Sequence, residues 1–131
     1  MLGIDTNVLV RLLIEDDAEQ TQHARTLVEQ TVTRGEGVLV SLLVLMETEW
    51  VLRSRYGLDK ATSIGTFRAL LETHEIVFED GPSIEQALFD WADKSADFAD
   101  CLIAAHNLRL GCTATATFDA RASQLPGFVR A

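Results

Sequence analysis

Short apolar runs alternate with helical stretches along the whole chain, and no hairpin signal joins one run to the next. The strands are predicted over Met1–Asp5, Gly37–Ser41, Glu75–Phe78, Thr113–Phe118 and Phe128–Arg130. The helices are predicted over Thr6–Ile14, Ala18–Thr33, Leu42–Tyr56, Asp59–Glu72, Ser83–Lys94 and Asp97–Leu110. Strands separated by helices pair in parallel and need helices on both faces of their sheet. The sequence therefore predicts an α/β protein with a mostly parallel sheet.

The length and composition fit one folded domain, which we predict to span residues 1–131. The chain has 131 residues, of which 47% are apolar and 24% are charged, and no repeat or low-complexity stretch divides it. Its 11 basic and 20 acidic residues give a net charge of -9, so the molecule as a whole repels polyanions. A nucleic-acid substrate would need bound cations or a local basic patch.

Neither a membrane span nor a disulfide framework is expected. The longest charge-free run, Gly37–Met46, has ten residues, whereas a span needs about 20. The N-terminus carries Asp5 and Arg11 where a signal peptide has an uninterrupted apolar core, so we expect a cytoplasmic protein. Cys101 and Cys112 form no CxxC pair and have no histidine at zinc spacing, which predicts reduced, buried thiols.

Asp5 is the only charged residue among the first ten. It lies where the first predicted strand meets its helix, at the sheet edge where ligands of α/β proteins bind. A helix cap is the alternative role, and Thr6 could serve in its place. The sequence leaves both roles open for Asp5.

Glu47 differs from an ordinary surface acid. Its helical neighbours are all apolar: Leu43, Val44, Trp50 and Val51. Glu49, by contrast, has Arg53 four residues on and is expected to be the exposed acid of the pair. Because a carboxylate on an apolar face must be paired, hydrogen-bonded, protonated or metal-bound, we predict a functional role for Glu47.

Three further acids are candidates for a functional site. Asp97 and Asp100 share one side of the first turn of the helix DFADCLIAA, and Asp119 ends the strand-forming run TATATF. Each has an ordinary alternative role as a helix cap or as a partner of the helix macrodipole. All five acids are nevertheless expected near the same edge of the sheet. Converging carboxylates repel by roughly 4 kcal/mol per pair at about 4 Å, so they need a cation, and oxygen-only ligands favour Mg²⁺ or Mn²⁺.

Other chemistries lack their residues. The chain has neither a GxxxxGK[ST] loop nor a GxGxxG turn, which argues against ATP or NAD. His23 and His74 are isolated, and His106 is expected to be a partly buried structural histidine, since its helical neighbours are apolar. Metal-free RNA cleavage by a histidine pair is therefore not expected.

Four motifs, IDTNVLVRLL, METEWVL, DFADCLIAA and TFD, occur in the order found in the PIN-domain ribonucleases. The chain resembles this family end to end, and in its small size it resembles a VapC-type toxin of a bacterial toxin-antitoxin pair. The resemblance implies a three-layer α/β/α fold, RNA cleavage that depends on Mg²⁺ or Mn²⁺, homodimers and neutralisation by a cognate antitoxin. It also implies Asp5, Glu47, Asp97 and Asp119 as the metal-binding acids, with Asp100 as a fifth.

On the basis of this resemblance, we expect the following roles for the candidate site residues. Asp5, Asp97 and Asp119 are expected to hold the metal, while Glu47 and Asp100 complete its surroundings and help to deprotonate water. Asn7 and Thr117 are expected to support these acids, and Arg11 and Arg121 to contact the RNA backbone, with solvated surface as the alternative for both arginines. A non-catalytic binding module and a metal-dependent DNA nuclease or phosphatase remain alternative functions.

Overall fold

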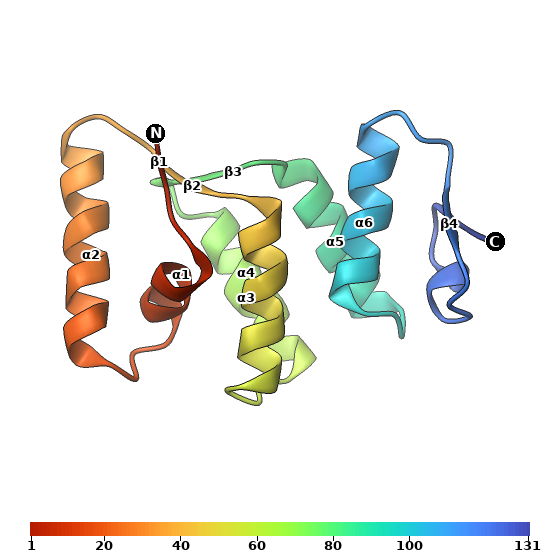
Figure 1. The fold of residues 1–131 in the computed structure, drawn as a ribbon, viewed down its shortest axis with the longest axis horizontal. Helices are drawn as coiled ribbons and strands as arrows, with labels where there is room; N and C mark the ends of the chain where they lie inside the picture. Colours follow the sequence, from red (N-terminus) through yellow and green to blue (C-terminus); the bar gives the residue numbers. More distant parts are fainter. The chain divides into compact units, whose positions relative to one another are not determined.

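The computed structural model describes all 131 residues and shows the predicted alternation of strands and helices (Figure 1). The chain forms two compact units, Met1–Glu79 and Asp80–Ala131. The first contains β1 (Leu2–Gly3), α1 (Thr6–Leu13), α2 (Ala18–Thr33), β2 (Val38–Val40), α3 (Leu42–Ser54), α4 (Lys60–Leu71) and β3 (Ile76–Phe78). The second contains α5 (Gly81–Asp93), α6 (Phe98–Arg109), β4 (Thr115–Thr117), the 3-10 helix η1 (Ala122–Gln124) and β5 (Phe128–Arg130).

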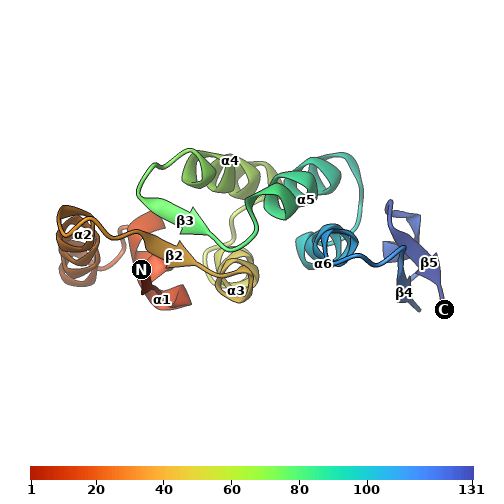
Figure 2. The same cartoon turned by 90° about the horizontal axis from the view of Figure 1, so that it is seen from above.

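The first unit is organised on a three-stranded parallel sheet of order β1-β2-β3. Leu2 is paired with Val38, and Val40 with Phe78. Figure 2 shows β2 and β3 side by side, with α4 next to β3. Both valines of β2 are completely buried, as expected for the central strand of a parallel sheet.

Helix α1 packs against both α2 and α3 in the first unit (Figure 1). The core of the first unit contains Leu9 of α1, Leu45 and Leu52 of α3, and Phe67 of α4, all of them buried. Gly57 lies in the turn after α3 and has a φ of +64°. Glycine adopts this left-handed conformation without steric cost. The packing of α1 against α3 fixes the helix that Asp5 caps relative to the helix that carries Glu47 in its middle.

The second unit is built on the helix pair α5 and α6 and a two-stranded parallel sheet of β4 and β5. The rings of Trp91 and Phe98 lie with their centroids 5.2 Å apart, and Ile84 and Leu88 of α5 and Leu102 of α6 are buried. The predicted strand at Phe128–Arg130 is confirmed as β5.

These elements confirm the predicted α/β class, a three-layer α/β/α fold whose strands pair only in parallel. Three details differ from the predictions. The hydrogen bonds form one three-stranded and one two-stranded sheet, η1 was not predicted, and α5 begins at Gly81 because Asp80 caps it ahead of Pro82. None of the helices combines the length and the apolar character that a membrane crossing requires.

The cysteine prediction is correct at one position and wrong at the other. Cys101 is buried within α6, whereas Cys112 is exposed. Cys112 follows Gly111, whose φ of +100° ends the helix, and the chain there has left the packed face of α6. Hydropathy alone does not distinguish these two environments.

Candidate functional site

Asp5 occupies the junction between β1 and α1 and caps the helix. Its Oδ1 accepts a hydrogen bond of 3.0 Å from the backbone N–H of Val8. The capping alternative is therefore realised for this residue. A cap uses one carboxylate oxygen, and the side chain is exposed, so Oδ2 remains available to a ligand.

Glu47, in the middle of α3, accepts a short hydrogen bond from the hydroxyl of Thr6. Thr6 is only 9% exposed and is the first residue of α1. From the sequence, Thr6 was expected only as an alternative helix cap. Its position beside Asp5 in IDTN suggested that it lies near the site, but nothing in the sequence indicated a hydrogen bond to a glutamate 41 residues away.

The environments of the two glutamates of α3 are the reverse of those predicted. Glu47 is exposed, whereas Glu49 is 5% exposed and accepts a hydrogen bond of 3.1 Å from Nε of Arg53. Two of its four apolar helical neighbours are themselves exposed, Leu43 to 78% and Trp50 to 58%, and the two valines are only half-buried. The predicted pairing of Glu49 with Arg53 is confirmed, but the argument from burial was wrong for Glu47, because its apolar neighbours do not cover it.

A pocket of about 520 Å³ brings residues of α1 together with residues of α3 and the turn after it. Its lining includes both acids of the first unit and two arginines: Asp5, Thr6, Asn7, Val10, Arg11, Glu47, Val51, Arg55 and Tyr56. Carboxylates that can ligate a cation and guanidinium groups that can bind an anion thus line the same hollow.

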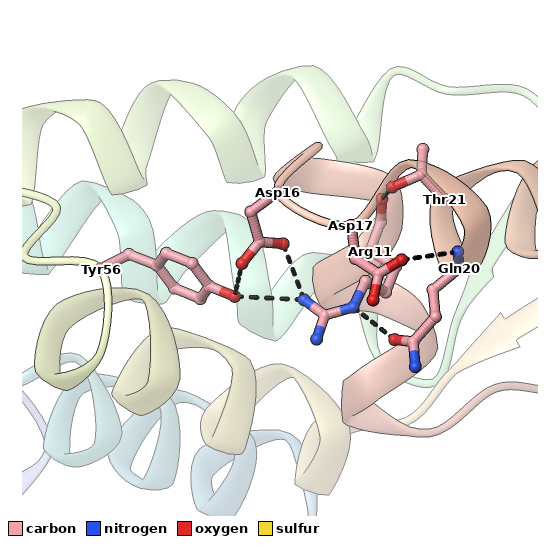
Figure 3. A network of polar contacts seen from close by, with 6 residues as sticks. All are labelled: Arg11, Asp16, Asp17, Gln20, Thr21 and Tyr56. Atoms are coloured by element: carbon pink, nitrogen blue, oxygen red, sulfur yellow. Dashed lines mark hydrogen bonds and ion pairs between the residues drawn. The ribbon is translucent and has the colours of Figure 1, made fainter.

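Arg11 is held in a network of polar contacts rather than solvated (Figure 3). Its Nε donates to Gln20 at 2.6 Å, and its Nη1 donates to Asp16 at 2.8 Å and to the Tyr56 hydroxyl at 3.1 Å. Tyr56 in turn donates to the second oxygen of Asp16 at 2.8 Å. The side chain of Arg11 is 16% exposed, so a freely solvated arginine is excluded at this position.

Asp97 lies at the N-cap position of α6, but its side chain makes no capping hydrogen bond. At the other five α-helices the N-cap side chain accepts from the third residue after it; these caps are Asp5, Asp17, Ser41, Asp59 and Asp80. The capping alternative is therefore not realised for Asp97. Its carboxylate remains available for another partner.

Asp100 and Asp119 have opposite electrostatic environments. Burial raises the pKa of Asp100, and the like charges of Asp97 and Asp119 raise it further, while Arg121 opposes the shift. The pKa of Asp119 is lowered because its Oδ1 accepts from the backbone N–H groups of Ala122 and Arg121, at 3.2 and 2.8 Å. In the second unit, Asp100 thus lies close enough to two other carboxylates to be repelled by both.

The supporting residues of the second unit are partly engaged. The hydroxyl of Thr117 accepts a hydrogen bond of 3.0 Å from the backbone N–H of Asp119, which fixes the chain where β4 ends. Arg121 provides the positive charge beside Asp119 and Asp100. The predicted structural role of His106 is confirmed, because its Nδ1 lies 2.8 Å from Oδ2 of the buried Asp80.

The predicted metal ligands are divided between the units, with Asp5 and Glu47 in the first and Asp97, Asp100 and Asp119 in the second. Within either unit, no three acidic, histidine or cysteine side chains are placed so that they could hold a metal ion. The donor chemistry nevertheless fits a hard divalent cation, because every candidate ligand is a carboxylate and the acids of the second unit repel one another.

Comparison with known proteins places this chain in a family. The family model of the PIN domain matches residues 3–127. No curated protein matches the chain. Among solved structures it is similar to Mycobacterium tuberculosis VapC20, described as a sarcin-ricin loop cleaving toxin, with 20% identity over 100% of this chain and 98% of that one. The TM-score of 0.39 is too low for this likeness to support any argument about function.

Proposed function

The chain belongs to the PIN domain family, and we propose that it is an endoribonuclease that hydrolyses RNA phosphodiester bonds with the help of Mg²⁺ or Mn²⁺. The observation that carries this proposal is the state of Asp97, whose carboxylate lies at a helix N-terminus without capping it. This carboxylate and that of Asp119 both raise the pKa of the partly buried Asp100 by like-charge repulsion, which a bound cation would offset.

Five carboxylates are proposed to serve this reaction. Asp5, Asp97 and Asp119 would hold the cation directly or through water, and Glu47 and Asp100 would complete its surroundings and accept a proton from the attacking water. When bound, the cation supplies charge neutralisation at the phosphoryl group and lowers the pKa of water. We further propose that residues 1–131 act as one nuclease domain.

The residues around these acids have supporting roles. Thr6 orients Glu47 through its hydrogen bond. Thr117 fixes the backbone that presents Asp119, and Asn7 lines the pocket of Asp5. Arg121 is proposed to contact the RNA backbone. Arg11 would contribute through its free Nη2 only, since its other nitrogens are engaged.

Cleavage of a labelled RNA by the purified protein tests the enzymatic proposal. We expect cleavage with Mg²⁺ or Mn²⁺ and none with EDTA, and we expect Asp97→Asn to abolish it. Asp59→Asn is the matched control, because Asp59 is also an aspartate at a helix N-cap but is not one of the five proposed metal-binding acids. Cleavage of a DNA of the same sequence in place of the RNA would support a DNA nuclease, and binding without cleavage of either would support a non-catalytic module.

We also propose that the chain is the toxin of a toxin-antitoxin pair, a cytoplasmic homodimer neutralised by an antitoxin. The exposed Leu43 and Trp50 flank Glu47 on α3 and offer apolar contacts to a partner segment. A basic side chain of that partner would satisfy the acids of the pocket. We propose that partner helices lie against α3 and α4, between Leu42 and Leu71, a surface that includes this face.

Growth of bacteria that express the chain alone tests the toxin proposal. Wild-type protein should arrest growth, and Asp97→Asn should relieve the arrest at equal protein levels, with Asp59→Asn again as the control. Undisturbed growth at a high level of folded wild-type protein would contradict the proposal. Sedimentation of the purified chain measures the expected dimer.

A further inference from the structure

Arg55 is an exposed cation in the pocket of Asp5 and Glu47. The pocket is lined by one other arginine, Arg11, whose charge is compensated by Asp16 at 2.8 Å. No hydrogen bond or ion pair engages the guanidinium of Arg55. Arg55 is therefore the pocket's only positive group without an acidic partner.

The backbone at Arg55 is fixed even though its side chain is free. Its N–H donates to the carbonyl of Val51 at 2.9 Å, and the N–H of Leu58 donates to Leu52 at 3.0 Å after the left-handed turn at Gly57. These bonds set the point on the pocket rim from which the guanidinium extends.

The next residue, Tyr56, is held by side chains. Its hydroxyl donates to Asp16 at 2.8 Å and accepts from Arg11 at 3.1 Å (Figure 3). The rim therefore combines a rigid phenol with a neighbouring arginine that is free to reach a ligand. Arg11 stabilises this rim, and its compensated charge leaves Arg55 as the anion-binding group.

A negatively charged RNA substrate requires a cationic side chain in this pocket. The chain carries a net charge of -9, and Asp5 and Glu47 add local repulsion against a phosphodiester. A guanidinium presents paired N–H donors that match two phosphate oxygens, and it stays charged at every relevant pH.

We infer that Arg55 binds a backbone phosphate of single-stranded RNA in the pocket of Asp5 and Glu47 and so positions the strand beside these carboxylates. This inference rests on the proposed function, because it assigns RNA to the same pocket. It adds a phosphate-contact residue that the sequence did not indicate.

A different role for Arg55 follows from its position at the C-terminus of α3, where a cation complements the helix macrodipole. Arg68 provides the matched control for that role. It is exposed in the last turn of α4 and does not line the pocket. Replacing either arginine removes the same charge from the protein and from a helix C-terminus.

The test is the binding of a short fluorescein-labelled single-stranded RNA, followed by fluorescence anisotropy in EDTA at several low salt concentrations. We expect Arg55→Ala to weaken binding by about tenfold or more, the effect of one hydrogen-bonded charge contact. The slope of log affinity against log salt should fall by about 0.7, the contribution of one phosphate contact to a single strand. Arg55→Lys should retain part of the affinity, and Arg68→Ala should bind as wild type does.

Each outcome separates this inference from the proposed function. Equal affinity and equal salt slope for Arg55→Ala and Arg68→Ala would overturn the inference, as would a wild-type protein that does not bind the RNA. Normal cleavage with an unchanged KM in Arg55→Ala would also overturn it while leaving the nuclease proposal intact. Arg55-dependent binding by a wild-type protein that cleaves no RNA would support the inference and overturn the nuclease proposal.

Discussion

The hydroxyl of Thr6 donates a hydrogen bond to Oε1 of Glu47, which joins the first turn of α1 to the middle of α3. The two residues are 41 positions apart, and the pocket that they line also contains Asp5. Because Glu47 is exposed, the burial of its own side chain cannot orient it. The nearly buried hydroxyl of Thr6 does so instead.

Removing this hydroxyl should impair catalysis more than stability. We expect Thr6→Ala to lower the rate of RNA cleavage by about 10- to 100-fold, the usual effect of losing a group that orients a metal ligand. Thr6→Ser keeps a hydroxyl at the same position and should retain most of the rate. Steady-state cleavage of a labelled RNA measures both.

Thr66→Ala serves as the control for this prediction. The hydroxyl of Thr66 donates to the carbonyl of Thr62 within α4, and Thr66 does not line the pocket. If Thr6→Ala cleaves as fast as Thr66→Ala, Glu47 does not depend on Thr6 for its role.

The elements of the fold could be predicted from local signals. Capping residues such as Ser41 and Asp59 stand directly before periodic apolar stretches, and Gly57 and Gly111 take the positive φ that ends a helix. These signals act over a few residues, so a single sequence contains them.

The environment of a side chain could not be predicted in the same way. Helical spacing correctly paired Glu49 with Arg53, but it did not reveal which face of α3 the rest of the chain covers. Glu49 is consequently buried where exposure was predicted, and Glu47 is exposed beside Trp50. Burial depends on contacts between distant segments, which a periodic pattern does not specify.

The same limit applies to the arginines. Arg11 was predicted to contact the RNA backbone, whereas its polar network depends on Tyr56, 45 residues away. Arg55 could not be identified from its sequence neighbours, because it is a candidate RNA contact only through the pocket that it lines together with the distant Asp5.

The first stability prediction concerns the uncapped Asp97. In EDTA, we expect Asp97→Ala to change the free energy of unfolding little or to raise it, because the substitution removes a repelling charge and no capping bond. Asp59→Ala should lower the free energy of unfolding by about 1 kcal/mol, because it removes the cap that accepts a hydrogen bond of 2.8 Å from the backbone N–H of Thr62. Urea unfolding of both variants and wild type provides the comparison. A loss for Asp97→Ala as large as that for Asp59→Ala would show that Asp97 is a structural cap.

Metal binding should stabilise the wild-type fold. Mg²⁺ at about 100 times its dissociation constant should add roughly 2.7 kcal/mol, provided that the unfolded chain does not bind it. Asp97→Asn should reduce this gain, since it removes one carboxylate ligand, whereas Asp59→Asn should respond as wild type does. Thermal melts of the three proteins with and without Mg²⁺ measure the effect. Equal shifts in all three would exclude Asp97 from the metal-binding residues.

The last prediction concerns Asp80, which joins the beginning of α5 to the end of α6. Its carboxylate accepts hydrogen bonds from Ser83, lies 2.8 Å from Nδ1 of His106 and pairs with Nε of Arg109 at 2.7 Å. Burial alone would raise the pKa of Asp80, but the hydrogen bonds from Ser83 and His106, together with the charge of Arg109, lower it below its ordinary value of 3.8.

A carboxyl group whose pKa is lower in the folded than in the unfolded state stabilises the fold at pH values above the unfolded pKa. This contribution is lost as the pH falls below 3.8 and through the folded pKa, because the unfolded chain then binds more protons. Asp80→Asn should therefore be less stable than wild type at neutral pH, and the difference should shrink toward about pH 3. Urea unfolding across this range measures it, with Asp93→Asn, an exposed acid of the same helix, as the control that should follow wild type. A difference between Asp80→Asn and wild type that stays constant down to about pH 3 would mean that the charge of Asp80 does not stabilise the fold.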